Sequence, residues 1–436
     1  MTDFLVSNIS PVQWDELTIL NLLQASKREA LAGRTAESEQ LLVRVAQQAP
    51  NHPAVLNELG VRMLGRGQAD QAQKLFSHAA TIAPREPAIW ANLASSLKAL
   101  GRAAEALGAL EKALILEPRH LSALLQKASH LEDSGEILAA SRLYRNALAC
   151  VPPRGQVPES MAQGVAHARE VVAADVEVLG AELEGPLQEI RQRHGVSDRR
   201  VRMCLDILLG KRISYPSQPT WMYFPELPAI EFFDRALFPW MDALEAATDS
   251  IRAELLEVLA TDRDELTPYV NFAATDPLDQ WRELNHNRRW SAYYLWNYGE
   301  PYPTHLARCP MTAKLLEGAP CARIATRAPN AFFSILDAKT RIPPHTGMTN
   351  TRLTVHLPLI IPPQCGFRVG GETREWIAAK MWAFDDTIEH EAWNDSNVPR
   401  AILIFDIWNP LLTQAEREMI QTAVEIYSRH YRWQTE

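Results

Sequence analysis

Small and apolar residues recur with a fixed period of 34 residues along the N-terminal part of the chain. The period is marked by four glycines (Gly33, Gly67, Gly101 and Gly135) and by four prolines (Pro50, Pro84, Pro118 and Pro152). A constant period of this length is typical of stacked repeats. Each glycine falls where two helices would turn, and each proline falls where the second helix would end. The pattern predicts four helical hairpins from about Ile19 to Pro152.

Within each period, small residues occupy the positions where paired helices must approach closely. These positions are Gly60, Ala94 and Ala128 on the first helix, and Ala72, Ala106, Ala140, Ala79, Ala113 and Ala147 on the second. The pattern resembles the tetratricopeptide repeat and predicts an α-solenoid over residues 19–153, after a leader over residues 1–18. Solenoids of this kind expose a concave groove that binds peptide or protein, although a structural or dimerising role is the alternative. Glu29 and Ser38 depart from the pattern, so we expect the first repeat to be a capping unit.

After the repeats, the pattern changes twice. Residues 154–199 carry apolar residues at helical spacing, such as Val165, Ala168 and Val172, and are predicted to form a helical connector of one or two helices. Prolines and aromatic residues then interrupt the chain before a predicted helix from about Trp240 to Leu259. We place the start of a new domain at residue 200, extending to residue 436.

The last part of the chain consists of short apolar and β-branched runs separated by Pro, Gly and Asn. The runs span residues 291–296, 331–336, 352–361, 367–369, 380–384 and 401–407. Such a succession, without intervening helices, predicts an antiparallel double sheet or jelly roll. Thr413, followed by Glu416 three residues later, predicts the capped start of a closing helix that ends near Tyr431. The predicted fold class is multidomain α + β, an α-solenoid followed by a jelly-roll domain with flanking helices.

Composition and charge narrow the possible functions. A length of 436 residues predicts two or three domains, and a net charge of -9 gives no electrostatic reason to expect a nucleic-acid partner. No apolar run approaches the roughly 18 residues of a membrane span, and the N-terminus lacks a signal-peptide pattern, so a cytoplasmic location without a membrane span is expected. Five cysteines without any Cys-x-x-Cys pair argue against a disulfide scaffold or a thiolate zinc site.

Polar residues on two predicted strands indicate a binding site. Arg352, Thr354 and His356 alternate with apolar residues and therefore share one face of their strand. That face would line the interior of a jelly roll, where charge is costly unless an anion or a metal compensates it. Arg400 alternates with Ile402 in the same way and places a second cation on such a face.

These residues belong to a longer pattern that resembles a known family, the aspartyl/asparaginyl β-hydroxylases. The matching text is Pro-His345-Thr-Gly-x-Thr-Asn-x-Arg352, then His356-Leu, then Phe-Asp-Asp-x-x-Glu-His390-Glu-x-Trp393-Asn-Asp, then Arg400 and Asp406-x-Trp408-x-Pro410. The resemblance covers roughly residues 200–412, with the specific motifs between 330 and 410. It implies a double-stranded β-helix and a dioxygenase that depends on Fe(II), 2-oxoglutarate and O₂. Repeats before the catalytic domain also match the architecture of animal members.

Carried over to this sequence, the resemblance assigns roles to individual residues. His345 and His390 would be the metal ligands, since neutral imidazole suits Fe(II). The carboxylate that most related oxygenases place two residues after the first histidine is replaced by Gly347, as in this family, which predicts a more open iron site. Arg400, with Ser334 as hydroxyl partner, would bind the distal carboxylate of 2-oxoglutarate. His356 and Arg352 would contact the other end of the co-substrate or a carboxylate of the substrate.

Several residues keep a structural alternative. Asp385, Asp386 and Glu389 could supply a carboxylate ligand, but are better explained as turn formers and as partners that orient His390. His356 could be a core residue. A purely structural role is expected for His286, His305 and His430, and Trp290 and Trp393 either border the pocket or belong to the aromatic core. Animal members carry a further arginine at the position of Thr354, so the nature of the substrate carboxyl group stays open.

The expected function is hydroxylation of an unactivated carbon, coupled to oxidative decarboxylation of 2-oxoglutarate to succinate and CO₂. The substrate most like that of the family is the β-carbon of an Asp or Asn residue in a peptide or protein docked by the repeats. The alternatives are the same chemistry on a lipid acyl chain or a small molecule, and a repeat-based adaptor without catalysis. The sequence does not indicate an oligomeric state.

Overall fold

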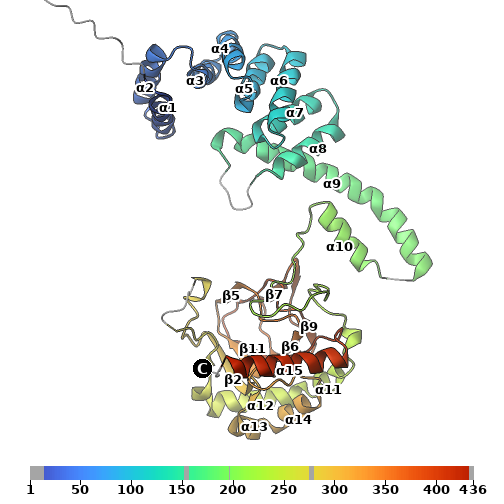
Figure 1. The fold of residues 1–436 in the computed structure, drawn as a ribbon. Coiled ribbons are helices and arrows are strands. Elements are labelled where there is room, and N and C mark those ends of the chain that lie inside the picture. The colour runs from blue at the N-terminus through green and yellow to red at the C-terminus, as the bar shows by residue number, and fades with distance from the viewer. Residues whose placement is uncertain (1–13, 152–156, 196, 274–278, 432–436) are drawn as a thin grey trace, which may run out of the picture. The chain divides into compact units, whose positions relative to one another are not determined.

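The chain divides into two compact units, Met1–Ser197 and Asp198–Glu436. The computed structural model describes residues 14–151, 157–195, 197–273 and 279–431 (Figure 1). Of the predicted leader, residues 1–13 lie outside the described residues, and the first helix already begins at Glu16. No helix among the described residues combines the length and the apolar character that crossing a membrane requires.

The N-terminal unit contains the predicted array of helical hairpins. Its paired helices are α1 (Glu16–Leu31) and α2 (Thr35–Gln48), α3 (Pro53–Gly65) and α4 (Ala69–Ile82), α5 (Pro87–Ala99) and α6 (Ala103–Leu116), and α7 (Leu121–Asp133) and α8 (Ile137–Leu148). The glycine after the first helix of each pair has positive φ, for example +77° at Gly33 and +74° at Gly101. This conformation costs glycine nothing, which explains its recurrence at each turn. The predicted α-solenoid is therefore confirmed.

Close helix approach explains the small residues. A Cβ atom on Gly60 would lie 2.5 Å from the ring of Phe76, so the aromatic side chain of α4 occupies the space that glycine leaves on α3. Ala72 and Ala106 are fully buried at the corresponding helix contacts. Packing at this density tolerates no added methyl group without displacement of a neighbour.

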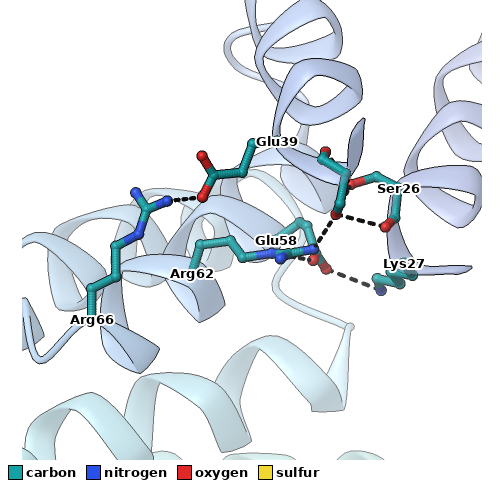
Figure 2. Close-up of polar contacts among 7 residues, drawn as sticks. Ser26, Lys27, Glu39, Glu58, Arg62 and Arg66 are labelled. Carbon is teal, nitrogen blue, oxygen red and sulfur yellow. Dashed lines mark hydrogen bonds and ion pairs between the residues drawn. The ribbon is translucent and has the colours of Figure 1, made fainter. Parts of the chain in front are cut away.

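A group of hydrogen bonds and ion pairs connects the first repeat to the second (Figure 2). Ser26 and Ser38 exchange hydroxyl-to-carbonyl hydrogen bonds of 2.8 and 2.7 Å, and Arg62 of α3 donates to the Ser38 hydroxyl at 2.9 Å. Glu58 is almost fully buried and forms ion pairs with Arg62 at 3.2 Å and Lys27 at 3.3 Å. The polar residue at position 38 thus supports a hydrogen-bonded contact between α2 and α3 in place of apolar packing.

The connector after the repeats is one long helix, α9 (Glu159–His194). Its buried residues Val165 and Ala168 pack in one cluster with Tyr144 of α8, and its Asp175 accepts a 2.6 Å hydrogen bond from Ser141. The helix therefore extends the repeat array through the fourth hairpin. It ends at Gly195, which adopts the left-handed conformation typical of helix C-termini.

Two antiparallel sheets form the framework of the C-terminal unit. The larger sheet has the order β1 (Thr267–Pro268), β2 (Trp290–Asn297), β4 (Ala331–Leu336), β11 (Arg400–Trp408), β6 (Arg352–Ile360) and β9 (Trp382–Phe384), with β3 (Glu300–Pro301) paired to β2. The smaller sheet has the order β5 (Thr340–His345), β10 (His390–Asn394), β7 (Cys365–Val369) and β8 (Glu372–Arg374). The predicted antiparallel double sheet is confirmed.

The helices of this unit differ in part from the prediction. They are α10 (Arg199–Leu208), α11 (Met241–Ala246), α12 (Thr248–Thr261), α13 (Pro303–Arg308), α14 (Pro310–Gly318) and α15 (Gln414–His430), with short 3-10 turns at Arg235–Leu237, Arg263–Glu265 and Asp279–Trp281. The expectation of strands without intervening helices is wrong, because α13 and α14 separate β3 from β4. Pro303 and Pro310 are the first residues of these helices, where proline is tolerated. The predicted capping box of Thr413 and Glu416 is present at the start of α15.

Each face of the larger sheet packs in a different hydrophobic core. On the outer face, Leu353, Val355 and Leu357 of β6 share a core with Ile251 and Leu255 of α12. Figure 1 shows α12, α13 and α14 gathered on one side of this unit, opposite β5 and β7. The inner face meets the smaller sheet in a second core that includes Phe367, Phe384 and Ile402. The Arg352, Thr354 and His356 face of β6 is therefore turned toward the space between the sheets.

Candidate active site

Two histidines from neighbouring strands form the centre of the site. His345 ends β5 and His390 begins β10, and the two residues are register partners in the antiparallel ladder. Directly opposed residues in such a ladder bring their side chains together. The ring centroids of His345 and His390 lie 4.1 Å apart.

Backbone carbonyls fix the orientation of both rings. Nδ1 of His345 donates to the carbonyl oxygen of Pro343 at 2.8 Å, and Nδ1 of His390 donates to that of Ile388 at 3.0 Å. A donating Nδ1 leaves Nε2 as the metal-binding nitrogen of a neutral imidazole. Burial lowers the pKa of His345 to about 4. Burial, together with the neighbouring His345, also places the pKa of His390 well below its ordinary value. Both rings are therefore neutral near pH 7, the state that a metal requires.

Gly347 lies against the carboxyl group of Asp386. A Cβ atom at position 347 would lie 2.3 Å from the Asp386 carboxyl carbon, and the Gly347 amide donates to the Asp386 carbonyl oxygen at 2.7 Å. The space beside Gly347 is thus occupied by the carboxyl group of Asp386 from another segment. The openness of the iron site itself stays a prediction. Burial, and then the charge of Asp385, raise the pKa of Asp386 to about 7.

The neighbouring acids have other partners. The Asp385 carboxylate accepts hydrogen bonds from Thr387 and from Ser217, at 2.6 and 2.8 Å to the hydroxyl groups, and Glu389 pairs with Arg368 at 2.9 Å. Asp385 also accepts from the Thr387 amide at 3.0 Å, which agrees with its predicted role as a turn former. Because Nδ1 of His390 donates to the Ile388 carbonyl, Asp385 and Glu389 do not orient this ring by a side-chain hydrogen bond at that atom. Among the described residues, no cluster of three or more His, Cys, Asp or Glu side chains is arranged to hold a metal ion.

Arg400 is the largest fully buried side chain of the described residues, with 1% of its surface exposed. Its Nε and Nη1 atoms have no hydrogen-bond partner, and its guanidinium lies over the ring of Trp376 at 4.8 Å. Burial lowers the pKa of Arg400 to about 10, which still leaves the group charged near pH 7. A buried cation with unused donors requires a compensating anion. The chemistry of this position therefore fits the carboxylate that the sequence predicted.

His356 connects the histidine pair to Arg400. Its ring lies 4.9 Å from that of Phe384, which in turn lies 5.4 Å from the ring of His390. Burial and the charge of Arg400 place the pKa of His356 well below its ordinary value, and its Nδ1 has no partner. A neutral ring with an unused nitrogen beside Arg400 fits a role in binding a polar ligand.

Ser334 lies on the same inner face as Arg400. It is fully buried on β4 opposite Ile402, two residues along β11 from Arg400, and its hydroxyl accepts a 3.1 Å hydrogen bond from the indole of Trp290. The hydroxyl proton of Ser334 stays available for a ligand on this face.

Arg352 stands at the opposite end of the inner face and is already paired. Its Nη1 contacts the Asp406 carboxylate and donates to the Arg327 carbonyl oxygen at 3.1 Å. Asp406 also accepts from the Asn330 amide at 3.1 Å, and Thr354, its register partner, donates to Asp386 at 3.2 Å. The structure therefore brings His356 and Arg400 together, and it leaves Arg352 in an ion pair away from them.

Aromatic side chains surround His345. Trp281 meets its ring edge-on at 5.0 Å, and Trp290 lies 6.4 Å away and stacks on Tyr269 at 4.0 Å. Trp290 thus borders the site. Trp393 alternates with His390 and Ala392 along β10 and contacts Arg341 at 5.8 Å, so it belongs to the other face of the smaller sheet.

Sequence reasoning missed two tryptophans and the partner of Arg352. Trp376 and Trp382 contribute buried indole nitrogens without partners to the same compartment as Arg400 and His356. Trp376 lies in a coil segment, where no helical or strand periodicity predicts which way its side chain points. Asp406 could have been found, because it shares the alternation of Arg400 and Ile402 on β11.

Comparison with known proteins matches both parts of the chain. Residues 245–410 match the aspartyl/asparaginyl β-hydroxylase family, and residues 30–97 match the tetratricopeptide repeat. The resemblance stated from the sequence is thereby confirmed.

Three relatives illustrate the match to the β-rich unit. Human aspartyl/asparaginyl β-hydroxylase is 33% identical over 183 residues, which cover 42% of this chain and 24% of that protein. The ornithine lipid ester-linked acyl 2-hydroxylase of Rhizobium tropici is 31% identical over 42% of this chain and 62% of that protein. Human aspartate β-hydroxylase domain-containing protein 2 is 28% identical over 47% of this chain and 54% of that protein. The match thus spans about a quarter of the length of the human β-hydroxylase.

Proposed function

We propose that this protein is a dioxygenase that uses Fe(II), 2-oxoglutarate and O₂ to hydroxylate an unactivated carbon. The single observation that carries the proposal is that a neutral histidine pair and a buried arginine with unused donors are connected through the rings of Phe384 and His356. The family match of residues 245–410 supports hydroxylation as the reaction class.

His345 and His390 would hold the iron through their Nε2 atoms. Their Nδ1 contacts to carbonyl oxygens keep both rings in the metal-binding tautomer and prevent rotation. When bound, iron would supply the activation of O₂ that carbon hydroxylation requires. As only two protein ligands, His345 and His390 would leave more coordination positions open for 2-oxoglutarate and O₂ than three protein ligands would.

Arg400 would bind the distal carboxylate of 2-oxoglutarate. A guanidinium forms paired, charge-assisted hydrogen bonds with a carboxylate, and the unused Nε and Nη1 atoms are suited to this contact. The Ser334 hydroxyl would donate to the same ligand from the neighbouring strand. The aromatic rings around His345 and His356 would exclude water from the reacting atoms.

The proposed substrate is a side chain of Asp or Asn in a peptide or protein docked by the repeats. Tetratricopeptide repeats suit protein interaction. On β6, the charge of Arg352 is balanced by Asp406, and Thr354 contacts Asp386. A neutral amide is therefore favoured over a carboxylate as the group beside the iron. An acyl chain is a second candidate, because a relative from Rhizobium tropici is an acyl 2-hydroxylase.

An assay of succinate formation tests the proposal. Wild-type protein with Fe(II), 2-oxoglutarate and O₂ should form succinate, and His345→Ala and Arg400→Ala should each reduce the rate to background. Cell extract treated with wild-type protein and analysed by mass spectrometry for addition of one oxygen atom would identify the substrate. Absence of iron-dependent succinate in the presence of extract would favour the adaptor function.

A further inference from the structure

Trp376 lies beside Arg400 and His356 in the space between the two sheets. It follows β8 in a coil segment and is only 5% exposed. Its ring lies 4.8 Å from the Arg400 guanidinium carbon and 6.1 Å from the ring of His356. No carboxylate of the described residues forms an ion pair with Arg400, so the face of Trp376 is the main contact seen for this cation. A desolvated cation over an indole ring is a favourable electrostatic pairing.

Several neighbouring side chains around Arg400 carry unused hydrogen-bond donors. Besides Nε and Nη1 of Arg400, the indole nitrogens of Trp376 and Trp382 are buried without a partner. The two indoles stack with centroids 6.0 Å apart, and Trp382 is the register partner of His356. Leaving a buried donor unsatisfied costs about 1–3 kcal/mol, so several together indicate an acceptor that binds there.

We propose that Trp376 binds the co-substrate and positions Arg400. Its ring would hold the guanidinium plane, and its indole N–H would donate to the same distal carboxylate of 2-oxoglutarate. A carboxylate has about four lone-pair sites, enough for an arginine and an indole together. The inference rests on the proposed function, since it assumes that 2-oxoglutarate occupies the compartment.

Trp376 would also limit the length of the co-substrate. From the metal-binding end, the inner face presents the His345 and His390 pair, then Phe384 and His356, and then Arg400 against Trp376. Because the indole packs against Arg400, we expect it to oppose a dicarboxylate one methylene longer than 2-oxoglutarate. Wild-type protein should therefore bind 2-oxoadipate more weakly than 2-oxoglutarate.

Calorimetry with Mn(II)-loaded full-length protein tests the inference, because Mn(II) allows binding to be measured without turnover. Trp376→Leu should weaken 2-oxoglutarate binding by about 10-fold to 100-fold, and Trp376→Phe, which keeps an aromatic ring, by a smaller factor. Trp376→Leu should also reduce the preference for 2-oxoglutarate over 2-oxoadipate. In an Arg400→Met background, Trp376→Leu should weaken binding by less than about 3-fold, because contacting residues are not additive.

Trp393→Phe is the matched control, since Trp393 also contacts an arginine, Arg341, but on the other face of the smaller sheet. It should bind 2-oxoglutarate like the wild type. The inference is overturned if Trp376→Leu and Trp376→Phe bind within twofold of wild type, or if Trp393→Phe weakens binding as much as they do. If Trp376→Leu fails to fold, Trp376→Phe alone decides. A wild-type protein that binds no 2-oxoglutarate contradicts the proposed function itself, and the inference falls with it.

Discussion

His345 and His390 are oriented in the same way, each by the carbonyl oxygen of the residue two positions earlier in the chain. The acceptors are Pro343 and Ile388, at 2.8 and 3.0 Å. Because the two residues are register partners at adjoining strand ends, their free Nε2 atoms belong to one site. The backbone beside each histidine thus orients the pair without help from an acidic side chain.

Loss of either histidine should abolish tight metal binding. His345→Ala and His390→Ala each leave one imidazole, so affinity for Co(II) as a probe should fall by at least about 100-fold. Calorimetry measures the affinity, and circular dichroism verifies the fold. His430→Ala, in an exposed residue at the end of α15, should bind Co(II) like the wild type. Equal affinity of wild type and both site variants would place the metal elsewhere.

A side chain at position 347 should destabilise the protein, because it would collide with the carboxyl group of Asp386. The added Cβ of Gly347→Ala would lie 2.3 Å from the Asp386 carboxyl carbon, so unfolding free energy should fall by about 1–3 kcal/mol. Denaturant titration measures the change. Gly318→Ala is the control, because nothing lies within 4 Å of its Cβ. The additional change Asp386→Ala should restore part of the loss, and no restoration would show that the clash is not the cause.

The buried ion pair of Arg352 and Asp406 should be strongly coupled. Asp406→Asn leaves the arginine without its counter-charge and should cost about 3–5 kcal/mol of unfolding free energy. For the cycle, Arg352→Met and Asp406→Leu are each made alone and together. The double variant should cost clearly less than the sum of these two single changes, because it removes both charges. A double-mutant cycle in urea gives the coupling energy. Strict additivity would contradict a direct contact.

Replacement of His356 should change the pH dependence of stability. The pKa of His356 is well below 6.5 in the folded protein, whereas in the unfolded chain it is ordinary. As pH falls below 6.5, only the unfolded state takes up this proton, so the folded state loses about 1.4 kcal/mol per pH unit. His356→Phe lacks this loss, and its stability relative to wild type should rise between pH 6 and pH 5. Parallel stability curves in urea, followed by tryptophan fluorescence, would refute the pKa direction.

The sequence predicted those features that repeat or alternate. The period of Gly33 and Pro50 gave the hairpins, and the alternation of Arg352 with Leu353 gave the inner and outer faces of β6. The strands β5 and β10, which carry the two histidines, were not predicted from the sequence. Pro343 and Pro344 in β5, and the polar residues around His390 in β10, interrupt the apolar alternation by which strands are recognised. The family motif still pointed to His345 and His390, which the structure places as register partners.

Partners brought together by tertiary structure could not be read from the sequence. Asp386 fills the space beside Gly347 from a segment 39 positions later, and Trp376 reaches Arg400 from a coil without periodicity. The helices α13 and α14 begin at Pro303 and Pro310, in a region whose overall composition is typical of strands. Such contacts depend on the packing of the two sheets, which local propensity does not encode.

We propose that the histidine pair and Arg400 hold iron and 2-oxoglutarate at the same time. Anaerobic titration of the protein with Fe(II) and 2-oxoglutarate tests it directly, because chelation of the keto acid to Fe(II) produces a visible charge-transfer absorption. We expect this absorption in wild-type protein, its loss in His345→Ala, and a requirement for more 2-oxoglutarate in Arg400→Met. No absorption in the wild type, or an undiminished absorption in His345→Ala, would contradict it.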